Sequence, residues 1–203
     1  MASILKVDTI QDQSGNNIIN ENADTITIGA SGDTITIPTG ATLDLSNATQ
    51  TGVGGTNTPY FYGELASNQT ITRATFTKVT GLTQNELDSA SAFDGTTFTV
   101  PSGQGGKYYL EGVVTGDYQS IGQDGENTVV LIRKNGSYIK SAKWQNSSAS
   151  GQTGREITVT ASGIFNLSAS DTIELYAYLL DSSGGNADVQ ADRTSLMGFK
   201  IIE

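Results

Sequence analysis

The sequence predicts an all-β protein whose apolar residues are concentrated in one compact domain of the sandwich or barrel type. Short runs rich in β-branched residues alternate with turn clusters of Gly, Asn and Ser, and no stretch keeps a 3.6-residue apolar period long enough for a helix. The composition agrees, because the 203 residues include 24 glycines but only 3 prolines. Apolar residues become frequent only after about Pro59, so we expect the core there and a slender extension before it.

The composition also excludes several classes of function. The chain has no cysteine, which excludes disulfides, a thiolate nucleophile and cysteine metal sites, and no histidine, which excludes Ser-His-Asp triads and the usual zinc or iron ligand sets. Its net charge of −10 opposes binding to nucleic acid and to anionic membranes. No apolar run has the length of a signal peptide or a membrane span. We therefore expect a non-enzymatic protein, made in a cytoplasm, with no nucleic-acid partner and no membrane insertion.

Residues 1–22 combine an apolar start with a turn-rich stretch. The apolar side chains are those of Ile4, Leu5, Val7 and Ile10, and Gln, Asn, Ser and Gly residues follow them. This pattern predicts a hooked or hairpin segment that docks on another protein. We interpret it as an anchor.

Residues 23–46 contain a repeated unit. Asp24–Ile28 recurs nine residues later as Asp33–Ile37 and is echoed by Ala41–Leu45. Each copy alternates small polar and β-branched residues, so one copy offers only a thin apolar stripe that neighbours must bury. Other copies of the same chain, wound around a common axis, would do so. The unit predicts a short β-repeat shaft, followed by a Gly/Thr-rich linker over residues 47–58.

In residues 59–203, short strand-like runs alternate with turn residues at regular intervals, which is typical of a sandwich or barrel. The Asn135-Gly136 pair predicts a hairpin, because this dipeptide readily supplies the two positive φ angles of a type I′ turn. The predicted strands are Tyr60–Leu65, Arg73–Thr80, Thr96–Val100, Gly106–Thr115, Thr128–Lys134, Tyr138–Gln145, Glu156–Asn166, Thr172–Leu180 and Thr194–Ile202.

Two of these strands are apolar on both faces. In Val129–Ile132 consecutive apolar side chains point to opposite sides of the sheet, so both faces should be shielded from water. In the strand near the carboxyl end, Ile173 and Leu175 belong to one face, while Tyr176 and Tyr178 belong to the other. We expect the first face to fill the core and the two tyrosines to form a trimer interface.

The order of motifs in residues 59–203 resembles the jelly-roll heads of the complement-component-one-q and tumour-necrosis-factor superfamily. The resemblance rests on Phe98–Pro101, Gly106–Val113, Val130–Gly136, Asp171–Leu175 and Thr194–Ile201. The sequence departs from the family pattern at Ser170, where Gly is usual, and at Leu196, where Phe is usual. The resemblance implies a ten-stranded jelly roll that trimerises about a three-fold axis through a largely apolar interface and has no catalytic residues.

The amino-terminal segment resembles the opening of bacteriophage tail-fibre and other virion appendage proteins. The similar residues are Ile4–Asp12 and Gly15–Asn17. Together the two resemblances imply a homotrimeric tail fibre in the virion, assembled in the host cytoplasm. Its anchor would bind other virion proteins, and its head would bind a host cell-surface molecule such as a glycan. The alternative is a capsid decoration protein or head fibre.

Loop residues supply the remaining candidate sites. Tyr118 and Trp144 with Asn146 are aromatic and polar residues that could contact a receptor on an exposed loop. For Trp144, a half-buried strand position that fills the sandwich is the commoner explanation. Carboxylates gather in two further loops: Asp117, Asp124 and Glu126 in one, and Asp181, Asp188 and Asp192 in the other. Calcium needs several converging oxygens, but solvated acidic loops are the commoner explanation, so we expect no cofactor. A glycan-degrading tailspike would need a facing acid pair in an aromatic groove, and the single tryptophan makes that function less favoured.

Overall fold

A computed structural model of the chain describes residues 9–11, 13–14, 17–22, 25–28, 31–44, 57–146, 154–182 and 184–201. The chain divides into two compact units, Met1–Thr51 and Gly52–Glu203. The described residues form β-strands and no helix, which confirms the all-β prediction. Among these residues, accordingly, no helix could cross a membrane.

The amino-terminal unit contains a three-stranded antiparallel sheet in the order β1–β2–β3. Its strands are β1 (Thr9–Gln11), β2 (Asn17–Asn22) and β3 (Thr25–Ile28). Ile10 lies opposite Ile19, and Ile19 lies opposite Ile28, so isoleucines nine residues apart form one row across the sheet. The three side chains are 40%, 37% and 55% exposed. Residues 31–44 form no strand, although they carry the next copy of the repeat.

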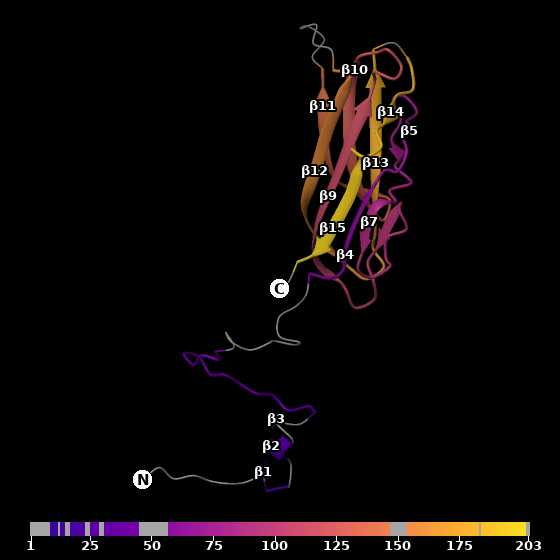
Figure 1. The fold of residues 1–203 in the computed structure, drawn as a ribbon. Coiled ribbons are helices and arrows are strands. Elements are labelled where there is room, and N and C mark those ends of the chain that lie inside the picture. Colours follow the sequence, from indigo (N-terminus) through magenta and orange to yellow (C-terminus); the bar gives the residue numbers. More distant parts are fainter. Residues whose placement is uncertain are drawn as a thin grey trace. The chain divides into compact units, whose positions relative to one another are not determined.

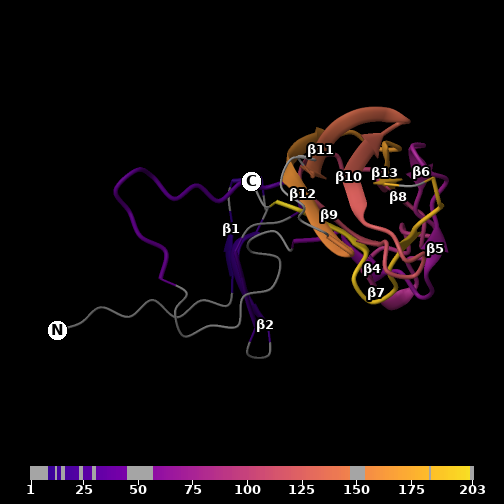
Figure 2. The same ribbon diagram turned by 90° about the horizontal axis from the view of Figure 1, so that it is seen from above.

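The carboxy-terminal unit is a sandwich of two antiparallel sheets (Figures 1 and 2). The first, which we call the β10 sheet, contains β11 (Ser137–Gln145), β10 (Gly125–Lys134), β13 (Thr172–Asp181), β6 (Thr77–Lys78) and β8 (Thr97–Thr99). The second, the β9 sheet, contains β12 (Glu156–Leu167), β9 (Gly106–Asp117), β15 (Ser195–Lys200), β4 (Tyr60–Glu64), β7 (Gln84–Asp88), β14 (Asp188–Val189) and β5 (Gln69–Thr70).

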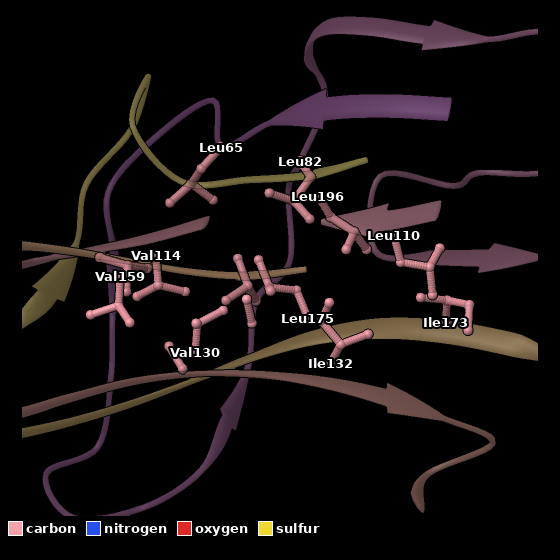
Figure 3. Packing of buried hydrophobic residues seen from close by; sticks show 14 of the residues in the cluster. Leu65, Leu82, Leu110, Val114, Val130, Ile132, Val159, Ile173, Leu175 and Leu196 are labelled. Atoms are coloured by element: carbon pink, nitrogen blue, oxygen red, sulfur yellow. The ribbon is translucent and has the colours of Figure 1, made fainter. Parts of the chain in front are cut away.

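Alternate residues of the two sheets meet in one core (Figure 3). Leu110 and Leu196 come from the β9 sheet, and Ile132 and Leu175 come from the β10 sheet; all four are fully buried. Gly112 lets the layers approach closely, because a Cβ there would lie 2.6 Å from Leu175 Cδ1. The burial of alternate positions leaves the intervening side chains of each sheet on its outer face.

Most predicted strands are present, and the Asn135-Gly136 turn has positive φ angles of 51° and 74°, as predicted. The strand predicted over 73–80 is largely wrong. Only Thr77–Lys78 forms a strand, and before it the chain turns at Ala74, whose φ is 58°. Three strands were missed: β5, β7 and β14. Two of them are only two residues long, and the third, Gln84–Asp88, is a polar strand at the sheet edge, so none gives an apolar alternation.

Candidate self-association surface

The outer face of the β9 sheet carries a row of large apolar side chains. Phe199 on β15 lies opposite Tyr60 on β4 and Tyr109 on β9, and Tyr109 lies opposite Ile164 on β12. Paired residues of antiparallel strands share a face, so the four side chains follow one another across four strands. Tyr60 is 44% exposed and Ile164 is 62% exposed.

A second row runs beside the first. Met197 lies opposite Tyr62 and Glu111, and Tyr62 lies opposite Leu87, which is 57% exposed. We call the two rows together the aromatic face, made of Tyr60, Tyr62, Leu87, Tyr109, Ile164, Met197 and Phe199. The rings of Tyr109 and Phe199 stack with centroids 5.4 Å apart. A contiguous apolar surface of this kind marks an interaction site on a soluble protein.

The carboxylates bordering the aromatic face are already hydrogen-bonded. The Tyr109 hydroxyl donates to Glu111 Oε2 at 2.7 Å, and this bond raises the pKa of Tyr109. The Tyr62 hydroxyl donates to Glu64, and Asn85 Nδ2 donates to the other oxygen of that carboxylate at 2.7 Å. Desolvation and the bond to Glu64 raise the pKa of Tyr62 to about 12, while the same bond lowers that of Glu64. Each of these acids therefore keeps a hydrogen-bond donor when a partner covers this face.

The acidic loops considered for calcium are engaged in local structure. Asp117 accepts the backbone N–H groups of Gln119 and Ser120 at 2.9 and 3.1 Å. Asp181, which is 1% exposed, accepts from Arg73 Nε at 2.6 Å and from the N–H groups of the following loop. Within the described parts of the chain, no three carboxylates converge as a metal site would require.

The prediction that Tyr118 lies on an exposed loop is wrong. Its side chain is fully buried, and its hydroxyl donates to the Asn127 carbonyl at 2.9 Å and lies 2.8 Å from Thr128 Oγ1. The ring occupies space left by Gly125, where a Cβ would come within 2.5 Å of it. Burial also raises the pKa of Tyr118 to about 12. A core residue of this kind cannot contact a receptor.

Trp144 and Asn146 are partly buried, whereas residues of a receptor-binding loop should be exposed. Trp144 lies on β11 opposite Thr128 and packs partly against the core. The Asn146 N–H donates to the Glu126 carbonyl at 2.9 Å. Residues 147–153, which follow Asn146, fall outside the described ranges.

The predicted interface and anchor residues are placed as follows. Ile173 and Leu175 are fully buried in the core, as expected, whereas Tyr176 and Tyr178 are half-buried on the outer face of the β10 sheet. That face lies on the opposite layer from the aromatic face. Of the anchor residues, Ile10 is exposed on β1, and Ile4, Leu5 and Val7 fall outside the described ranges.

The aromatic face was missed in the sequence, although its signal is present there. Tyr60 and Tyr62 alternate with buried residues, and so do Met197 and Phe199. This period of two reveals a face, but it does not reveal which strands become neighbours. Strand order, which brings residues 60–62 beside 197–199, is decided by tertiary structure.

No known family model matches this chain, and a search among curated proteins finds no match.

Proposed function

We propose that the chain is a non-enzymatic structural protein that assembles as a homotrimer, with residues 59–203 as its globular head. The observation that supports this most is the aromatic face, which joins exposed Tyr60 and Ile164 across four paired strands. A monomer would leave this surface in water, and burial of apolar area is the main driving force of stable association. Trimerisation specifically is implied by the jelly-roll resemblance.

The strand arrangement supports a jelly-roll head. The motifs that carry the resemblance lie on β8, β9, β10, β13 and β15, which are distributed over both sheets. Both sheets are antiparallel, and chain neighbours such as β9 and β10 belong to different layers, as crossing jelly-roll connections require. We therefore keep the jelly roll as part of the proposal.

The amino-terminal unit supports a shaft. Its apolar row of Ile10, Ile19 and Ile28 is exposed in the single chain, and so are Ile35 and Ile37 of the next repeat. A small sheet that exposes an apolar row is stabilised when a partner covers that row. We propose that residues 23–46 associate around the trimer axis and that residues 1–22 anchor the protein in a virion, as in a bacteriophage tail fibre whose head contacts the host.

The aromatic face replaces Tyr176 and Tyr178 as the proposed trimer interface, and one pair of variants tests it. Ile164→Asp places a charge on the face, whereas Tyr138→Asp places one at a position that is equally exposed, 62% against 63%, on the β10 sheet. Light scattering after size exclusion should give three times the 21.3 kDa chain mass for the wild type and for Tyr138→Asp. It should give one chain mass for Ile164→Asp, because an unpaired charge in an apolar interface costs several kcal/mol.

A wild-type monomer at micromolar concentration would refute the trimer. An Ile164→Asp trimer with unchanged circular dichroism would refute the interface. Gold-labelled antibody on intact particles tests the location: label at the tail supports the tail fibre, whereas label on the capsid would replace it with a capsid decoration protein or head fibre.

A further inference from the structure

The outer face of the β10 sheet combines aromatic rings with cations. Val129 on β10 lies opposite Tyr178 on β13 and Lys143 on β11, and Leu131 lies opposite Tyr176. Val129 and Leu131 are only 8% and 5% exposed, although they lie on the outside of the sheet. The larger side chains around them therefore form a cover. We call this cover the platform and define it as Phe76, Arg133, Tyr138, Lys143, Tyr176 and Tyr178.

The rings of the platform are held by one another and by a cation. The Phe76 and Tyr178 rings contact with centroids 5.1 Å apart, and the Arg133 guanidinium carbon lies 4.0 Å from the centroid of the Tyr176 ring. Tyr138, paired with Arg133, is 63% exposed, and Phe76 is 44% exposed. The platform thus presents ring faces and edges that a flat ligand can reach.

The cations of the platform have no carboxylate partner in the described parts of the chain. The ion pairs found there involve Arg73, Lys78, Lys134, Arg155 and Arg193. The Arg133 guanidinium lies over the Tyr176 ring, and Lys143 donates to the amide oxygen of Gln145. Glu174 lies opposite Arg133 on β13, and its carboxylate accepts from Lys78 Nζ at 2.7 Å and from the Tyr176 hydroxyl at 3.5 Å. The acid beside Arg133 is thus already paired with Lys78, which leaves Arg133 and Lys143 complementary to an external anion.

We propose that the platform binds an acidic carbohydrate, with sugar rings against the exposed rings of Phe76 and Tyr138 and the carboxylates of different sugar residues held by Arg133 and Lys143. This inference rests on the proposed function, because it names the chemistry of the host molecule that the head contacts. It places that contact on the sheet face instead of at Trp144 and Asn146. A short acidic sugar fits better than a nucleic acid, because the charge of the whole protein repels a long polyanion beyond the local cations.

Calorimetry on the full chain provides the test, with tetragalacturonate and tetrasialic acid as probes. Maltotetraose is the neutral control and a thymidine oligonucleotide is the nucleic-acid control. Arg133→Gln and Lys143→Gln each remove one platform cation, while Lys107→Gln removes the same charge from the β9 sheet, where Lys107 is exposed on β9. Phe76→Ala removes a platform ring that is 44% exposed and lies outside the buried core.

At least one acidic probe should bind, more weakly at higher salt, and maltotetraose should not. Arg133→Gln and Lys143→Gln should each weaken binding about tenfold, as expected for a lost charge-assisted hydrogen bond, and Phe76→Ala should weaken it as well. Lys107→Gln should bind like the wild type. No binding of either acidic probe, an equal loss in Lys107→Gln, or tighter binding of the oligonucleotide would each overturn the proposal. Light scattering on the same samples separates this result from the trimer, because the platform and the aromatic face lie on opposite sheets.

Discussion

Asp171 joins two turns at one end of the sandwich. Its carboxylate accepts from Lys134 Nζ, from the Ser168 N–H and from Asn135 Nδ2, each at 2.7 Å. Asn135 in turn accepts from the Thr172 N–H at 2.8 Å, so the hairpin turn of β10 and β11 is fastened to the start of β13. A single buried carboxylate thereby fixes the end of three strands.

This network makes stability depend on pH in acid. Burial opposes the charge of Asp171, but the three donors outweigh it and lower the pKa from 3.8 to about 2. The folded pKa lies below the unfolded one, so the contribution is complete above the unfolded pKa and is lost as the pH falls toward about 2. It amounts to about 2 kcal/mol.

Urea unfolding of Asp171→Asn should therefore show a free energy of unfolding about 2 kcal/mol below the wild type near neutral pH. The difference should shrink as the pH falls and should vanish only below about pH 2, once the carboxyl of the folded wild type is protonated as well. A difference that persists unchanged in acid would show that the charge of Asp171 is not its cause.

The tetrapeptide Thr-Ile-Thr-Ile occurs twice among the described residues and has two structures. Thr25–Ile28 is strand β3, paired with β2, while Thr34–Ile37 forms no strand. The two copies have the same intrinsic β propensity but different structures. The strands available to pair with each copy must therefore decide its conformation. In our proposal, the second copy acquires its partners from the other chains of the trimer.

Cysteine substitution can test that arrangement, because the natural chain contains no cysteine. Ile35 belongs to the apolar stripe, whereas its neighbour Thr36 belongs to the opposite side of the same extended run. Ile35→Cys should form disulfide-linked dimers on oxidation, because copies that meet at an axis bring this position together. Thr36→Cys should form few. Equal cross-linking of the two variants, on a non-reducing gel, would contradict the shaft.

At the scale of the whole molecule, the two units differ in how they bury apolar surface. Gly52–Glu203 has a continuous core that includes Phe61, Leu110, Ile132 and Leu196, and the rings of Phe61 and Phe98 stack at 4.1 Å. In Met1–Thr51 the large apolar side chains whose exposure is described are all exposed. The described core of the second unit is large enough for this unit to fold without a partner.

A chain that begins at Gly52 should therefore keep a cooperative thermal transition and a β-type circular dichroism spectrum. It should also keep the trimeric mass if the aromatic face is the interface, but lose incorporation into virions if residues 1–22 are the anchor. The full chain is the control for each measurement. Loss of the cooperative transition would mean that the amino-terminal unit is needed for folding.

The sequence by itself determined the all-β class, most strands, the Asn135-Gly136 hairpin and the inward facing of Ile173 and Leu175. These features depend on local periodicity and turn chemistry, which a single strand or turn contains completely. Only the tertiary structure decided that Tyr118 is buried, that Tyr60 and Ile164 belong to one surface, and that Arg133 lies over Tyr176. These are contacts between segments far apart in the chain, and they follow from strand order and register, which local periodicity does not specify.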